Sequence, residues 1–106
     1  MNITIPQGTT LDFEIIHTDD QGNPVDHTSS TIAAAIQSSK AHIDISDCFT
    51  GTATGFRGDI TAEISDALDP KLEYGWDLIA TTTGGSVTRI CYGSVKAVDT
   101  YALDEA

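Results

Sequence analysis

Side chains that carry oxygen ligands gather in the stretch HTDDQGNPVD, residues 17–26. Calcium prefers six to eight oxygen ligands, so this stretch is the best candidate cation site in the chain. The side chains that could supply oxygens are Asp19, Asp20, Asn23 and Asp26. Their spacing does not match an EF-hand loop, because the glycine comes at a different offset and no glutamate closes the set. The favoured interpretation is a turn between two strands, in which Gly22 takes a positive φ and Pro24 fixes the exit.

A second stretch that mixes acidic residues with a histidine is HIDISD, residues 42–47. In an extended chain His42 and Asp44 point to the same side, and Asp47 follows closely. Such a set could bind a metal ion, but a solvated strand edge is the favoured interpretation.

The three histidines are candidates for acid–base catalysis, since each has serines or aspartates nearby in the sequence. They are His17, His27 and His42. A hydrolase or transferase needs a nucleophile, a base in reach and a group that orients the base, and no motif of this kind is recognisable. We expect Cys48 and Cys91 to be free thiols, with a bridge between them as the alternative. We therefore predict a non-enzymatic protein with no catalytic, cofactor-binding or metal-binding residues, and no cofactor.

Length and charge limit the remaining functions. The chain has 106 residues, which predicts a single domain over residues 1–106. Sixteen acidic and five basic residues give a formal net charge of −11, so nucleic acid is not expected as a partner. No stretch approaches the roughly twenty apolar residues that cross a bilayer, so no membrane partner is expected. No secretion signal precedes the first expected strand, which predicts synthesis inside the cell.

The elements that must position these residues are predicted from alternation of apolar and polar residues, the pattern of half-buried strands. Segments with this pattern are residues 3–5, 11–15, 32–36, 43–45, 60–64 and 74–80, with a weaker Thr/Gly strand at 49–54. One helical turn is expected near residues 65–69, capped by Ser65. Gly84 and Gly85 predict a tight hairpin before a strand over Val87–Val98, whose mixed pattern indicates a bulge or burial on both faces.

Seven or eight short strands and no long helix predict an all-β fold. The expected architecture is an antiparallel β-sandwich of immunoglobulin-like size, with a small barrel as the alternative. Tyr74 and Trp76 share one face of a strand, which indicates that Trp76 fills the core. Tyr74 stands near a corner, where its hydroxyl is expected to bond to nearby backbone.

The order of these pieces resembles that of a group of small phage virion proteins. The segments that carry the resemblance are ITIPQGTTLDFEI, DDQGNPVDHTSSTIAAAIQS, GDITAEISDALDPKL and EYGWDLIATTTGGSVTRICYGSVKAV. The positions that match the group's pattern are Gly8, Gly22, Pro24, Val25, Asp26, Gly58, Ile60, Ser65, Leu72, Tyr74, Trp76, Asp77, Leu78, Arg89, Gly93 and Val95. The chain departs from the pattern at Ala33 to Ala35, where bulkier strand residues are usual, and at His27, where a leucine is usual.

The resemblance covers nearly the whole chain and implies an immunoglobulin-like sandwich, similar to the N-terminal modules of baseplate upper proteins and to capsid decoration proteins. It implies a structural accessory protein of the virion, made in the cytoplasm of the bacterial host. The implied partners are other virion proteins, either the major capsid protein or tail and baseplate proteins. Association into a homo-oligomer stays open.

A carbohydrate-binding adhesion module is the alternative from another functional class, with or without a calcium ion at residues 17–26. Sugar binding usually needs an exposed aromatic platform. Trp76 and Tyr92 would have to face solvent for the chain to offer one.

Overall fold

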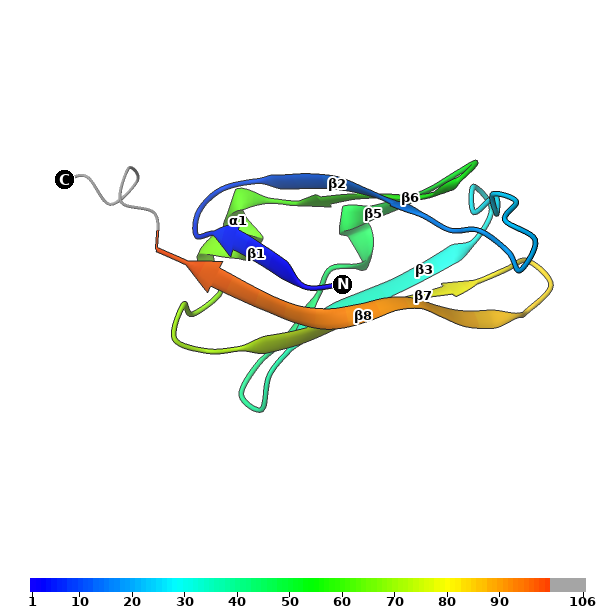
Figure 1. Ribbon diagram of the computed structural model, residues 1–106. Helices are drawn as coiled ribbons and strands as arrows, with labels where there is room; N and C mark the ends of the chain where they lie inside the picture. Colours follow the sequence, from blue (N-terminus) through cyan, green and yellow to red (C-terminus); the bar gives the residue numbers. More distant parts are fainter. Residues whose placement is uncertain (100–106) are drawn as a thin grey trace.

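The computed structural model describes residues 1–99 as eight strands, one short α-helix and one turn of 3₁₀-helix (Figure 1). The strands are β1 (Ile3–Pro6), β2 (Leu11–Ile16), β3 (Thr31–Gln37), β4 (His42–Asp44), β5 (Phe49–Thr52), β6 (Gly55–Ile60), β7 (Tyr74–Thr81) and β8 (Val87–Val98). The 3₁₀ turn η1 (Ser46–Cys48) leads into β5, and the helix α1 (Ala62–Asp66) follows β6. The strand count lies within the predicted range. The predicted domain runs to residue 106, but residues 100–106 lie outside the described residues.

The strands form two facing sheets, as predicted for a sandwich. One sheet has the order β1-β8-β7-β3-β4, and the other has the order β2-β6-β5. The prediction of a purely antiparallel sandwich is wrong at one pair, because β1 and β8 run parallel, with Ile3 opposite Val95 and Ile5 opposite Ala97. The chain passes from β1 directly into β2 of the opposite sheet, so β1 does not form a hairpin with its sequence neighbour and pairs with the distant β8 instead.

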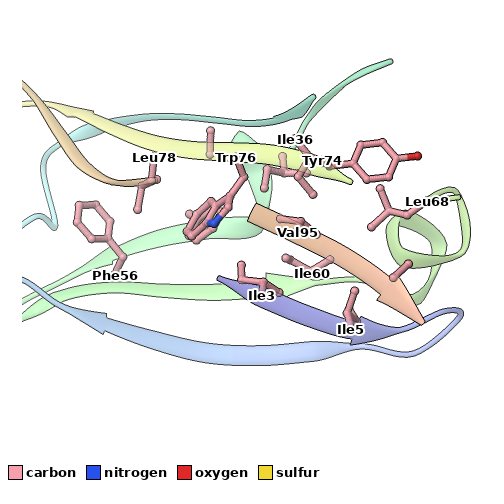
Figure 2. Packing of buried hydrophobic residues seen from close by; sticks show 14 of the residues in the cluster. Ile3, Ile5, Ile36, Phe56, Ile60, Leu68, Tyr74, Trp76, Leu78 and Val95 are labelled. Carbon is pink, nitrogen blue, oxygen red and sulfur yellow. The ribbon is translucent and has the colours of Figure 1, made fainter. Parts of the chain in front are cut away.

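The core lies between the two sheets, and β7 supplies its largest side chains (Figure 2). Tyr74, Trp76, Leu78 and Ala80 are all buried, whereas the residues between them are exposed or half-buried. Fully burying one large apolar side chain stabilises a fold by about 1.5–3 kcal/mol. The alternation in the sequence therefore predicted both the strand and its buried face correctly.

The hairpin between β7 and β8 contains the predicted irregularity. Leu78 pairs with Cys91 and Ile79 pairs with Arg89, so Ile90 is an extra residue on β8. This bulge changes which residues of β8 face the core and explains the mixed pattern of the sequence. In the turn, Gly85 has a φ of 89°, but Gly84 is not among the glycines with positive φ within residues 1–99. The prediction that both glycines supply positive φ is therefore wrong for Gly84.

The segment from residue 55 to residue 69 differs most from the prediction. A strand was expected over residues 60–64, but the observed strand β6 already ends at Ile60. The helix α1 begins directly after Thr61. The Thr61 hydroxyl caps this helix by accepting a hydrogen bond from the Ile64 N–H at 3.4 Å. Ser65 is therefore inside the helix, not its cap, and its buried hydroxyl donates to the Thr9 carbonyl at 2.7 Å.

Candidate functional site

The acidic stretch at residues 17–26 forms a tight chain reversal. A bridge pairs Thr18 with Pro24, and Gly22 has a φ of 82°. One carboxylate oxygen of Asp19 accepts hydrogen bonds from the backbone N–H groups of Gln21, at 2.9 Å, and Asn23, at 3.0 Å. The favoured turn interpretation thus matches the observed loop. Nowhere in residues 1–99 do three or more histidine, cysteine, aspartate or glutamate side chains gather in a group that could hold a metal ion.

The second candidate stretch lies on β4 and η1, at the edge of the five-stranded sheet. His42 Nδ1 is 3.1 Å from Oε1 of Gln37. Asp44 accepts hydrogen bonds from the Ser46 hydroxyl at 2.6 Å and the Ser46 N–H at 2.9 Å, and these bonds lower the pKa of its carboxyl group. The two side chains therefore have separate partners, as on a solvated strand edge.

Two of the histidines, by contrast, lie in direct contact. His17 Nδ1 is 2.8 Å from His27 Nε2, and the two rings are nearly coplanar and meet edge to edge, with centroids 5.1 Å apart. We call them the histidine pair. His27 also stacks on Phe56, with ring centroids 4.4 Å apart, and its Nδ1 is 2.9 Å from the Ser30 hydroxyl. The His27 side chain is 2% exposed, and burial, reinforced by the neighbouring His17, lowers its pKa, whereas Asp26 acts in the opposite direction. The sequence analysis did not predict this contact between His17 and His27.

The contacts from His17 through His27 to the Ser30 hydroxyl resemble part of a catalytic relay, but the histidine pair lacks access to a substrate. A general base must reach the proton that it removes from a substrate or nucleophile. Both ring nitrogens of His27 already have partners, and the ring is 2% exposed and packs on Phe56. The arrangement is suited to fixing the loop onto the core rather than to exchanging protons with a bound molecule.

A hollow of about 720 Å³ lies beside the η1 turn, over the outer face of β5 and β6, where Thr50, Arg57 and Asp59 line it. Its lining includes the carboxylates of Asp44, Asp47 and Asp59, together with the thiol of Cys48. Burial, followed by the negative charge of Asp59, raises the pKa of that thiol. The thiol therefore stays protonated at neutral pH and is a poor nucleophile. Both Cys48 and Cys91 are free, as expected.

The outer surface of the five-stranded sheet has a different character. We call it the alanine face and define it by Ala33, Ala35, Asp77, Ile79, Arg89 and Tyr92. Two shallow hollows of about 150 and 230 Å³ lie on it, and both are lined by Ala35 and Asp77. The small side chains of Ala33 and Ala35 leave these hollows open.

An exposed aromatic residue and an arginine stand beside the first hollow. Tyr92 is 61% exposed, and the Arg89 guanidinium lies 4.2 Å from the centre of its ring. Arg89 also lies 3.8 Å from the Asp77 carboxylate, so this pair neutralises itself within the alanine face. The face of an aromatic ring attracts a cation, which stabilises this arrangement of the two side chains by about 0.5–1 kcal/mol at an exposed site.

The aromatic platform required for sugar binding is incomplete. Trp76 is 4% exposed and packs inside the core, where its indole N–H donates to the Met1 carbonyl at 2.9 Å (Figure 2). The prediction that Trp76 fills the core is confirmed, and only Tyr92 of the two aromatic residues faces solvent, so the condition set for the sugar-binding alternative is not met.

Known proteins give no template for this site. The chain matches no protein-family model, no curated protein and no solved structure. Over residues 1–99, no helix has both the length and the apolar character needed to cross a membrane.

Proposed function

We propose that the chain is a non-enzymatic structural accessory protein of a bacteriophage virion, an immunoglobulin-like module that binds other virion proteins through its alanine face. Its position is on the capsid surface or in the tail and baseplate. The observation that carries this proposal is the pairing of Tyr92 and Arg89 beside an open hollow on the outer surface of the five-stranded sheet, with a second hollow next to it.

The sheet orders support the immunoglobulin-like assignment. In such sandwiches strands B, E and D form one sheet, and strands G, F, C and C′ form the other. The orders β2-β6-β5 and β8-β7-β3-β4 follow this arrangement when the strands are lettered along the chain. Tyr74 begins β7, the strand in the F position, and its hydroxyl accepts a hydrogen bond from the Asp69 N–H at 2.9 Å. This contact is the equivalent of a tyrosine corner.

The charge distribution supports a protein partner. The chain carries a formal net charge of −11, and such a surface repels nucleic acid. On the alanine face, however, the charges of Asp77 and Arg89 balance each other. Protein interfaces are depleted of net charge at their centre, and tyrosine and arginine are the residues that most often dominate their binding energy.

The experiment begins with mass spectrometry of salt-washed particles of the phage whose genome encodes the chain. We expect the protein in stoichiometric amounts, and its absence from the particles would reject the proposal. Ala35→Arg, which fills both hollows, should reduce incorporation into particles by an order of magnitude or more, about 1.4 kcal/mol of binding for each factor of ten. Ala53→Arg adds the same side chain to an exposed loop and should leave incorporation unchanged. Equal incorporation of the two variants would exclude the alanine face.

A further inference from the structure

The four outer strands of the two sheets are not equally protected against pairing with another chain. Natural edge strands are kept short, or carry proline or a bulge. β1 contains Pro6 and has four residues, β4 has three, and β5 has four, including Gly51. β2 has six residues in unbroken register with β6 and contains neither proline nor glycine. On its other side no strand within residues 1–99 pairs with β2.

The apolar side chains of β2 are incompletely covered. Leu11, Phe13 and Ile15 point toward the core but are only half-buried. Their register partners on β6 include Ile60 and Phe56, both almost completely buried. The difference lies on the open side of β2, where one further strand would cover the three side chains.

The opposite row of β2 carries two carboxylates, Asp12 and Glu14, and ends with the exposed Ile16. Asp12 forms an exposed ion pair with Arg57 at 3.2 Å. Glu14 is exposed, and none of the ion pairs found in residues 1–99 involves it. A strand beside β2 would place its own outward side chains next to these two carboxylates, where basic residues are favoured and acidic residues are repelled.

We propose that the open edge of β2 receives an extended strand of a partner protein in which apolar residues alternate with lysine or arginine. The backbone of that strand would continue the three-stranded sheet, its apolar residues would cover Leu11, Phe13 and Ile15, and its basic residues would face Asp12 and Glu14. In immunoglobulin-like sandwiches strand A occupies this place beside strand B, and that part of the argument rests on the fold assigned under the proposed function. The alanine face and the β2 edge are separate surfaces.

The test uses the protein at neutral pH and an eight-residue peptide of alternating valine and lysine. Amide hydrogen exchange followed by NMR should show about tenfold slower exchange at alternate residues of β2 when the peptide is bound. A peptide with the same composition but with its valines and lysines in two blocks is the control for nonspecific charge attraction. Protection at β1, β4 or β5 instead of β2, or equal protection by both peptides, would overturn the proposal.

A pair of charge variants locates the contact. Glu14→Lys should weaken binding of the valine–lysine peptide about two- to fivefold, as expected for an exposed charge contact, and should favour a valine–glutamate peptide. Glu73→Lys makes the same change in net charge at an exposed residue before β7 and should have a smaller effect. Equal weakening by the two variants would show that only the net charge acts. Because no virion is involved, the outcome is independent of the particle experiment.

Discussion

His17 Nδ1 and His27 Nε2 lie 2.8 Å apart on the facing edges of two nearly coplanar rings, and this distance leaves room for only one proton between them. With both rings charged, two N–H groups would point at each other. Burial against Phe56 adds to the cost of charging His27. The loop that carries the acidic turn is thus joined to the core through a contact that favours an uncharged His27.

Acidification should therefore destabilise the fold. The pKa of His27 is lowered from its usual 6.5, so below that pH the unfolded chain binds a proton that the folded chain does not. The free energy of unfolding should fall from pH 6.5 downward until the pKa of the folded state is passed, by at most about 1.4 kcal/mol per pH unit. Urea unfolding at pH 7.5, 6.5 and 5.5 measures this slope.

His27→Leu retains an apolar contact with Phe56 and should flatten the decline between pH 7.5 and 5.5. His42→Gln removes a histidine from the exposed β4 edge and should leave the wild-type slope. If the free energy of unfolding still falls with pH in His27→Leu, the histidine pair is not the source of the pH dependence.

Gly93→Ala should detach the start of the chain from β8. A Cβ atom at position 93 would lie 2.0 Å from the Met1 carbonyl oxygen, which accepts the hydrogen bond from Trp76. The backbone of Met1 must move, and we expect a loss of about 1–3 kcal/mol. Trp76 is the only tryptophan, so its fluorescence should shift to the red and become more accessible to iodide. Gly75→Ala is the matched control, since a Cβ there meets no atom closer than 3.8 Å; equal shifts in both variants would refute the steric explanation.

Tyr74→Phe should destabilise the corner before β7. The variant leaves the Asp69 N–H without the hydroxyl that accepts its hydrogen bond at 2.9 Å. Losing a partner for a partly buried donor costs about 1–2 kcal/mol. The midpoint of urea unfolding should fall with an unchanged m-value. Tyr92→Phe makes the same chemical change at a side chain that is 61% exposed, and a similar loss there would contradict the role given to the corner.

Calcium should not stabilise the acidic turn. The Asp19 carboxylate already accepts two backbone hydrogen bonds, and the Asp26 carboxylate accepts bonds from the N–H and hydroxyl of Thr28 at 2.8 and 2.7 Å. We expect the same Tm in micromolar calcium and in EDTA, measured by thermal melting. Asp19→Ala should lower the Tm equally in both solutions. A large rise in the Tm of the wild-type protein with calcium would show that the loop is a cation site.

Sequence patterns predicted β7 well because large apolar residues alternate there with small or polar ones, and predicted β8 because the Gly84-Gly85 turn marks where the returning strand begins. The pattern failed at β6, whose glycines have no side chain that could mark a face. A Cβ at Gly58 would come within 3 Å of the rings of Phe13 and Phe49, so this glycine is required by packing between distant strands. Ile60, Ala62 and Ile64 alternate as they would in a strand, which is why a strand was expected. In the structure Thr61 caps the helix α1, so the strand ends before it.

The candidate sites depend on register, which the sequence alone does not specify. His17 and His27 meet because the acidic turn folds back on itself. The backbone N–H of His17 also donates to the Thr54 carbonyl and that of His27 to the Thr52 carbonyl, which holds the two residues next to each other. Tyr92 and Asp77 lie opposite each other on the alanine face in the register that precedes the bulge at Ile90. One residue more or less in the bulge would place Arg89 on the other side of the sheet.

The parallel pairing of β1 with β8 has a consequence for biosynthesis. Ile3 and its partner Val95 are separated by almost the whole length of the described chain. Until β8 has been made, Ile3 and Ile5 lack the strand that pairs with them. Contacts between distant parts of a chain form slowly, so this pairing cannot form early while the chain is being made, and we expect it to be among the later contacts in folding.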